Sequence, residues 1–250
     1  MDIFSFHLKG KMAHFRRFYS NSSALTYTIP PRTTVCGIVA GLMGYERDSY
    51  YEDFSLENCN ITVSLNSQVK KTMQKLNLLM IKGLNDLNGS KENHSQVPTE
   101  FLIPQNIREE EIDYKVWINF KQLKVQKQFE ALLLEEKECY RTNAISCALG
   151  LAHNVGRFEY EGIYSGENYS TKNSVSINSS VPVDNITEID QETDQLSLIV
   201  EELPLEFDVN RSLTTNGKKR ILFSRTGIPV RLIVKDHVQL ETGEKICWMK

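Results

Sequence analysis

The sequence predicts an α+β fold in which a ferredoxin-like domain carries a protruding hairpin arm and is followed by a smaller antiparallel β part. Three observations support this prediction. In residues 1–158, segments with alternating apolar residues and two segments with helical spacing of apolar residues follow one another. A polar, turn-rich segment separates the two halves of this pattern. Residues 159–250 contain short strand signals without a convincing helix. We therefore expect two domains, 1–158 and 159–250.

Each element of the first domain is predicted by its own period. Residues 2–8 alternate, with Phe4, Phe6 and Leu8 on one side, which is typical of a strand. Residues 35–43 follow Pro31 and repeat apolar side chains at helical spacing. We expect further strands over 59–65, 112–120 and 145–155 and a second helix over 122–137, whereas residues 73–84 fit either element. This β-α-β-β-α-β order is that of a ferredoxin-like domain.

The arm and the C-terminal strands are predicted from turn signals. Asn88 and Gly89 form a turn dipeptide inside a polar stretch, so residues 84–104 are expected to form the arm. In the second domain we expect strands over 196–200, 205–209, 219–224 and 230–240. Residues 9–31 show neither period and are interpreted as a long loop of the kind that often carries function.

The net charge of −3 conceals an uneven distribution of charge along the chain. Residues 1–45 contain five basic side chains and one acid, residues 183–208 contain nine acids and no Lys or Arg, and residues 211–235 contain seven basic side chains and no acid. The whole-chain sum therefore does not argue against nucleic-acid binding. The 211–235 segment either follows nucleic acid or forms the charged outer face of a small sheet.

Several classes of function lose their usual sequence support. No apolar stretch approaches the roughly 20 residues that span a bilayer, and the N-terminus has no basic leader, so we expect a cytoplasmic protein without membrane contact. The five cysteines are widely spaced without a C-x-x-C pair, and the five histidines lack metal-ligand spacing. Phosphate-loop, dinucleotide, zinc-protease and nucleophile-elbow motifs are absent from the sequence. We expect no metal and no cofactor.

Residues 9–23 mix cations, aromatic side chains and small polar side chains in a pattern that suits single-stranded RNA. Arg and Lys neutralise phosphates, aromatic faces stack on bases, and Ser or Asn donate to phosphate or 2′-hydroxyl oxygens. Arg32, Thr33 and Thr34 follow at a predicted helix N-terminus, where free N–H groups favour an anion and Arg32 is predicted to add a bidentate phosphate fork. The alternatives are a solvated loop with inward aromatics, and Thr33 or Thr34 acting only as a helix cap.

These residues resemble a known family. The motifs are K-G-K-x-A-H-F-R-R-x-Y-x-N-S-S from Lys9, I-P-P-R-T-T-V-x-G-I-V-A-G-L-M-G from Ile29, Y-E-R-D-x-Y-Y from Tyr45, V-P-T-E-F-L from Val97 and L-G-L-A-H from Leu149. Together they closely resemble the CRISPR-associated Cas-five family of the RAMP superfamily, subunits of the type I Cascade complex, and look most like the type I-B branch. The likeness covers about the first 155 residues.

The resemblance implies a RAMP domain, RRM-like in fold, that acts as a non-catalytic RNA-binding subunit in antiviral defence. Such a subunit caps the 5′ handle of the CRISPR RNA (crRNA), contacts the backbone RAMP subunit and the large PAM-reading subunit, and lies near target DNA. Carried over position by position, the RNA-contact candidates are Lys9, Lys11, His14, Arg16, Arg17, Asn21, Ser22, Arg32, Thr33, Thr34 and Arg47.

Two other functions stay open at this point. One branch of the family, in type I-C systems, cuts the CRISPR precursor RNA without a metal, using a Tyr, a Lys and a His. This sequence has Tyr45 after the first predicted helix and Lys91 and His94 in the arm, but it lacks the adjacent Lys-His pair. The remaining alternative is a structural adaptor whose basic segments contact acidic protein partners.

Overall fold

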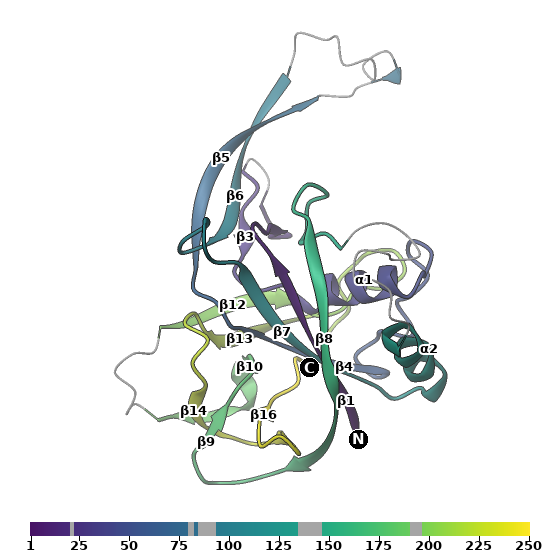
Figure 1. The fold of residues 1–250 in the computed structure, drawn as a ribbon, viewed down its shortest axis with the longest axis vertical. Helices are drawn as coiled ribbons and strands as arrows, with labels where there is room; N and C mark the ends of the chain where they lie inside the picture. Colours follow the sequence, from purple (N-terminus) through teal and green to yellow (C-terminus); the bar gives the residue numbers. More distant parts are fainter. Residues whose placement is uncertain (21–22, 80–82, 85–93, 135–146, 191–196) are drawn as a thin grey trace.

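A computed structural model of the chain describes residues 1–20, 23–79, 83–84, 94–134, 147–190 and 197–250 (Figure 1). Within these residues the protein is mostly β-sheet with two α-helices, which confirms the predicted α+β class. The elements of the N-terminal part are β1 (Asp2–Gly10), β2 (Phe15–Arg16), β3 (Thr26–Tyr27), α1 (Arg32–Leu42), β4 (Cys59–Leu65), β5 (Val69–Leu79), β6 (His94–Pro104), β7 (Ile112–Phe120), α2 (Leu123–Leu134) and β8 (Gly156–Tyr169).

The central sheet has the strand order β16-β15-β8-β1-β7-β4, with antiparallel neighbours throughout. The alternating residues Phe4, Phe6 and Leu8 of β1 are buried in the main core, together with Val39 of α1 and Phe129 of α2. The aromatic rings of Phe4 and Phe129 meet edge to face at 5.3 Å. The two helices therefore cover one face of the sheet. The alternation in β1 and the helical spacing in α1 and α2 place the apolar side chains of all three elements in one layer.

The opposite face of the sheet carries a network of charged pairs. Lys115 of β7 lies 2.8 Å from a carboxylate oxygen of Glu244 and 3.0 Å from one of Glu161. The His7 ring lies 2.7 Å from the carboxylate of Asp113, and Lys9 donates to Glu159 at 2.6 Å. Ile3 and Trp117 on this face belong to a separate buried apolar cluster, and the cations of its polar part are already paired with acids.

The arm is a long two-stranded hairpin that projects from the body of the protein (Figure 1). β5 and β6 pair in continuous register from Val69 with Pro104 to Leu79 with His94. The arm thus begins earlier than the predicted 84–104, because residues 69–79 supply its first strand. This also decides residues 73–79, whose period left helix and strand open, in favour of strand. The predicted Asn88-Gly89 turn lies outside the described residues.

The C-terminal part forms two small sheets, β10-β13-β12 and β11-β14-β9, and contributes β15 and β16 to the central sheet. Apart from the short 3-10 turn η2 (Val183–Asn185), the described residues of this part contain no helix. The elements are β9 (Val175–Ile177), β10 (Val181–Pro182), β11 (Ile186–Ile189), β12 (Leu198–Pro204), β13 (Lys218–Ser224), β14 (Val230–Val234), β15 (His237–Leu240) and β16 (Lys245–Ile246).

Two strand predictions are wrong, those over 145–155 and 205–209, and two have other bounds than expected. The described part of 145–155 is a turn rather than a central strand: Gly150 has a φ of 96°, and the N–H of Asn154 bonds to the Leu151 carbonyl. The strand expected over 196–200 overlaps the first residues of β12, which continues to Pro204. The strand expected over 205–209 is not formed, because the N–H of Leu205 bonds to the Gly217 carbonyl and the chain leaves the sheet there. The strand expected over 230–240 is two strands in different sheets.

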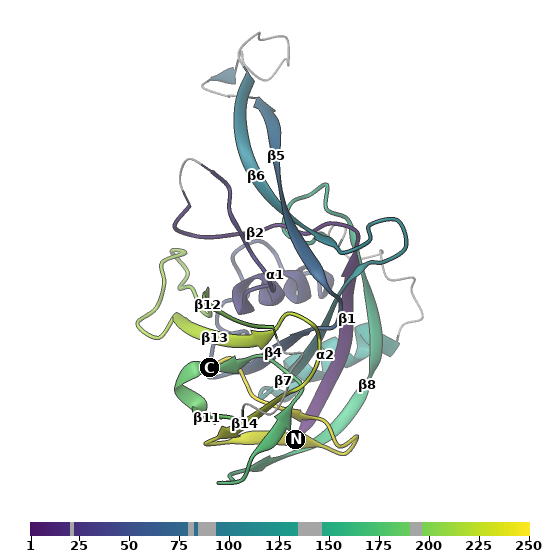
Figure 2. The ribbon, with the colours of Figure 1, turned by 90° about the vertical axis from the view of Figure 1, so that its left-hand side faces the viewer.

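The two halves of the chain share one core. β8 runs through the predicted boundary between residues 158 and 159, and it pairs with β1 up to Ser165 and with β15 from Gly166 onward. Leu203 of β12 and Phe223 of β13 are buried in the same cluster as Phe4. The strands β12 and β13 accordingly lie beside α1 and β4 (Figure 2). The division into two domains stays a prediction. Among the described residues, no helix is long and apolar enough to cross a membrane.

Candidate nucleic-acid interface

The described residues of 11–31, a range predicted as an irregular loop, form a narrow ribbon that is bonded to the base of the arm. β2 and β3 pair with each other, and Ala13 exchanges two main-chain hydrogen bonds with Leu102 of β6 at 2.9 and 3.0 Å. Ala24 does the same around β6, donating to the Pro98 carbonyl and accepting from Glu100, both at 2.8 Å. These bonds hold the ribbon in one position relative to the arm.

The outer edge of the ribbon presents a cation and two aromatic rings to solvent. Phe15 is buried while the adjacent Arg16 is exposed. Phe18 and Tyr19 are 44% and 51% exposed, and their rings meet edge to face with centroids 5.3 Å apart. We call residues 16–19 the 16–19 loop. Exposed aromatic faces beside a guanidinium are the combination that binds stacked bases and phosphates of single-stranded nucleic acid.

Two of the predicted RNA contacts in this ribbon are internal instead. His14 is only 2% exposed, and its Nδ1 lies 2.7 Å from the Glu100 carbonyl. Burial lowers the pKa of His14, which keeps the ring neutral at pH 7. Arg17 directs its guanidinium inward, where it donates to Glu201 at 2.7 Å, to the Tyr19 hydroxyl at 2.7 Å and to the Thr26 carbonyl at 3.1 Å. Both side chains shape the ribbon from within.

Arg32 is the clearest correction to the sequence analysis. Its side chain is 1% exposed, and its guanidinium donates at 2.6–2.9 Å to four main-chain carbonyls, those of Phe54, Ser55, Cys59 and Leu205. It cannot form the expected bidentate phosphate fork in this structure, because its two terminal nitrogens are already bonded inside the protein. The side chain instead joins the start of α1 to the 54–59 turn and to the C-terminal part.

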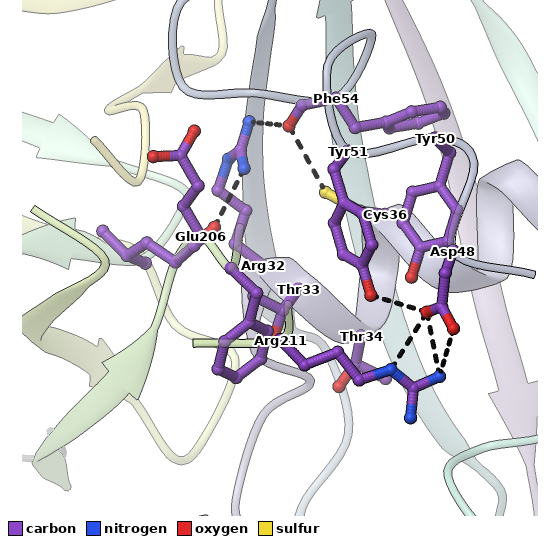
Figure 3. A pocket seen from close by; sticks show the side chains of 12 residues that line it. Arg32, Thr33, Thr34, Cys36, Asp48, Tyr50, Tyr51, Phe54, Glu206 and Arg211 are labelled. Carbon is purple, nitrogen blue, oxygen red and sulfur yellow. Dashed lines mark hydrogen bonds and ion pairs between the residues drawn. The ribbon is translucent and has the colours of Figure 1, made fainter. Parts of the chain in front are cut away.

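A pocket of about 370 Å³ opens beside the N-terminus of α1 (Figure 3). The cap position is Pro31, and no side chain among the described residues caps this helix end, so Thr33 and Thr34 are not its caps. The lining residues come from α1, from the loop after it and from the C-terminal part, and include Thr33, Thr34, Asp48, Tyr50, Tyr51, Phe207 and Arg211. We call it the α1 pocket. Hydroxyls, aromatic rings and a guanidinium around a helix N-terminus suit an anionic, partly aromatic ligand.

An ion pair forms one wall of the α1 pocket. Arg211 donates to both carboxylate oxygens of Asp48 at 2.8–3.0 Å, and the Tyr51 hydroxyl donates to Asp48 at 2.7 Å (Figure 3). These hydrogen bonds, first from Tyr51 and then from Arg211, lower the pKa of Asp48. The sequence analysis missed Arg211 as a site residue. The one signal in the sequence was that Arg211 begins the basic 211–235 segment. This segment is far from α1 along the chain, so the sequence did not connect the two.

The remaining candidates are scattered. Lys9 lies on the polar sheet face, paired with Glu159, and Lys11 donates to the Glu110 carbonyl at 2.8 Å from an exposed position. Arg47 is 80% exposed, with its Nε 3.4 Å from Asp48. Asn21 and Ser22 lie outside the described residues. The structure thus brings the candidates together in two places, the 16–19 loop and the α1 pocket.

Of the residues of the nuclease alternative, the structure describes the side-chain contacts of Tyr45. Tyr45 donates to the Asp53 carboxylate at 2.7 Å, and burial together with this bond raises the pKa of Tyr45, which opposes its use as a base. His94 begins β6 in the arm, and Lys91 lies outside the described residues. Among the described side chains, no group of three or more His, Cys, Asp or Glu could hold a metal ion.

Comparisons with known proteins agree with the sequence motifs. Residues 3–108 match the family described as CRISPR-associated protein (Cas_Cas5). A crystal structure of a CRISPR protein from Archaeoglobus fulgidus has a similar fold, with a TM-score of 0.55 and 14% identity over 98% of both chains. A chain of a CRISPR RNA-guided surveillance complex aligns with a TM-score of 0.46 and 12% identity over 97% of this chain and 92% of that chain. No curated protein matches the chain. The resemblance to the CRISPR-associated Cas-five family is therefore confirmed for residues 3–108.

Proposed function

We propose that the protein is a non-catalytic RNA-binding subunit of a type I CRISPR effector complex, Cascade, in which it caps the 5′ handle of the crRNA. One observation carries the proposal. Arg16, Phe18 and Tyr19 face solvent on a ribbon that main-chain hydrogen bonds fix to the arm, within the residues that match the Cas-five family. A preformed surface of this kind can stack bases without first ordering a loop, which lowers the entropic cost of binding.

The sheet topology supports the finer fold assignment. The strands β8-β1-β7-β4 are antiparallel neighbours, α1 lies between β1 and β4 in the chain, and α2 lies between β7 and β8. This is the order expected of a ferredoxin-like domain, and it supports a RAMP or RRM-like domain as the scaffold of the RNA site. In this arrangement the helices cover one face of the sheet, and paired charges and a buried apolar cluster around Trp117 occupy the other, so we assign the RNA site to the ribbon.

The arm is proposed to contact neighbouring subunits, namely the backbone RAMP subunit and the large PAM-reading subunit of a type I-B complex in the cytoplasm. Met73 and Leu78 on β5 are 49% and 47% exposed. Large exposed apolar side chains on a projecting arm favour a protein partner that covers them. Target DNA would then lie near this assembly.

Salt dependence of RNA binding tests the proposal. Affinity for an RNA carrying the 5′ handle would be measured from low to physiological salt for the wild-type protein and for the triple variant Lys11→Ala, Arg16→Ala, Arg47→Ala. These three exposed cations are the accessible members of the predicted set. The plot of log K against log salt should flatten by roughly 2, at about 0.7 for each phosphate that the variant no longer neutralises.

The matched control removes the same charge elsewhere. Lys124, Lys127 and Lys172 are exposed, the first two on α2 and the third between β8 and β9. The triple variant Lys124→Ala, Lys127→Ala, Lys172→Ala should keep the wild-type slope. An equal flattening of the slope in both variants would show unspecific attraction, and absence of RNA binding by the wild-type protein would favour the protein-adaptor alternative.

The absence of catalysis is part of the proposal and has its own test. Burial of Tyr45 and its hydrogen bond to Asp53 support it, since together they raise the pKa of a hydroxyl that cleavage would need as a base. Purified protein incubated with repeat RNA in EDTA should leave the RNA intact. Specific cleavage that Tyr45→Phe and His94→Ala abolish would contradict the proposal and establish the ribonuclease.

A further inference from the structure

One carboxylate of the acidic 183–208 segment is buried against the RNA-binding ribbon. Glu201 is the fourth residue of β12 and is 8% exposed, whereas its neighbours Val200 and Glu202 are exposed. It accepts hydrogen bonds from Arg17 at 2.7 Å and from the N–H and hydroxyl of Thr28 at 2.8 and 3.1 Å. A buried carboxylate is tolerated only when such donors replace the water that it loses.

The donors around Glu201 come from three segments. Arg17 precedes the turn of the ribbon, Thr28 follows it, and Lys71 belongs to the base of the arm, with its Nζ 3.5 Å from Glu201 and 3.8 Å from Glu100. The carboxylate therefore joins both ends of the ribbon to the first strand of the arm. Because β2 and β3 are only two residues each, their own ladder is too short to hold the ribbon.

The interaction continues from Arg17 to the exposed aromatic rings. While one guanidinium nitrogen bonds to Glu201, another donates to the Tyr19 hydroxyl at 2.7 Å, and the guanidinium carbon lies 5.9 Å from the Tyr19 ring centroid and 5.5 Å from that of Tyr27. Tyr19 in turn meets Phe18 edge to face. A chain of direct contacts thus runs from Glu201 through Arg17 to both rings of the 16–19 loop.

We propose that Glu201 is a positioning residue that holds the 16–19 loop in its RNA-binding conformation through Arg17. This inference rests on the proposed function and extends it, since Glu201 lies outside residues 3–108 and in the most acidic part of the chain. In this proposal Glu201 favours RNA binding, although its negative charge alone would oppose it. An acid near RNA ordinarily repels phosphates, whereas Glu201 neutralises internal cations and strengthens binding by fixing the rings.

The sign of the effect on affinity separates positioning from simple electrostatics. Glu201→Gln removes one negative charge and one of the two acceptor oxygens, so it cannot accept from both Arg17 and the Thr28 N–H as Glu201 does. Positioning predicts about tenfold weaker binding of the handle RNA, comparable to the removal of one stacked base. Electrostatic repulsion by Glu201 predicts tighter binding. The salt slope should stay within about 0.7 of the wild-type value, because Glu201 contacts no phosphate.

Glu202→Gln is the matched control. It removes the same charge from the next residue, which is exposed and lies 3.3 Å from Lys218. It should bind RNA as the wild-type protein does, or slightly tighter. If Glu201→Gln and Glu202→Gln bind alike while the wild-type protein binds RNA, the positioning role is overturned and the proposed function stands. If the wild-type protein does not bind RNA, the proposed function itself fails.

A double-mutant cycle and hydrogen exchange distinguish positioning from a general loss of stability. Arg17→Gln and Glu201→Gln should each weaken binding, and the double variant should be no weaker than either one, since both interrupt the same chain of side chains. In the free protein, Glu201→Gln should speed exchange of the Arg17, Ala24 and Thr28 amides and leave those of β1 and β7 unchanged. Uniformly faster exchange, or additive decreases in affinity, would contradict the inference.

Discussion

Asp48 and Arg211 form a bidentate ion pair across 163 residues of sequence, and both have a left-handed backbone, with φ angles of 63° and 60°. Left-handed backbone is unfavourable for residues other than glycine, more so for Arg than for Asp or Asn. The ion pair therefore holds two strained turns against each other at the α1 pocket (Figure 3). Because the Arg211 guanidinium is bonded to Asp48, the pocket presents less positive charge than its residues indicate.

Asp48→Asn should strengthen RNA binding. The substitution frees Arg211 for a phosphate, while Asn tolerates left-handed backbone and still accepts from Tyr51. We expect a salt slope steeper by about 0.7, corresponding to one more phosphate contact. The control is Glu46→Gln, an exposed acid of the same loop that forms no ion pair with the described residues. Equal affinities for the two variants would exclude a phosphate from the α1 pocket.

Arg32→Ala should destabilise the fold rather than remove a direct bond to RNA. The variant removes the Arg32 donors from four carbonyls, three of them buried, at a cost of about 3 kcal/mol or more. Urea unfolding would show a lower midpoint, whereas Arg16→Ala, at an exposed position, would leave the midpoint near its wild-type value. A stable Arg32→Ala protein with weak RNA binding would restore the phosphate-fork interpretation.

Gly150→Ala should displace the ribbon from the body of the protein. A Cβ at Gly150 would collide with the His14 carbonyl oxygen, and the φ of 96° disfavours any side chain. We expect a loss of roughly 2 kcal/mol or more of folding free energy. Gly243→Ala is the control, since φ there is also positive at 88° but no atom lies within 4 Å of the added Cβ. Similar destabilisation in both variants would show that only backbone strain matters.

Stability should fall as the pH decreases from 7.5 to 5. Burial lowers the pKa of both His14 and His237 below the ordinary 6.5, so the unfolded chain binds protons more readily. The two neutral histidines contribute fully to the free energy of unfolding above pH 6.5. This contribution is lost as the pH falls from 6.5 through their lower pKa values in the folded protein. Urea midpoints measured across this range would show the trend. His14→Asn should flatten it, and an unchanged pH profile would assign the dependence to other groups.

The sequence predicts elements well where one period governs a whole element. The alternation in 112–120 and the helical spacing in 35–43 correspond closely to β7 and α1. The prediction fails at 145–155 because an apolar residue is needed there for a different reason: Leu149 is buried in the core although it belongs to a turn. An apolar run shows burial, but it cannot distinguish a buried strand from a buried turn.

Site prediction from the sequence is limited by contacts between distant residues. Arg16, Arg17 and Arg32 all belong to the same motif-rich region and are chemically identical, yet only Arg16 faces solvent. What separates them is the Glu201 carboxylate and the Leu205 carbonyl, which come from the C-terminal part of the chain. A local pattern identifies which residue types suit RNA, whereas the partners that occupy those residues are set by tertiary structure.

The long strand β8 has a consequence for any attempt to produce the N-terminal part alone. A chain ended at residue 158 would retain three of the fourteen residues of β8 and would lose its pairing with most of β1. β1 would then become an open sheet edge, a template on which further chains can assemble. Such a fragment is expected to aggregate even though it contains every motif of the Cas-five resemblance up to that point.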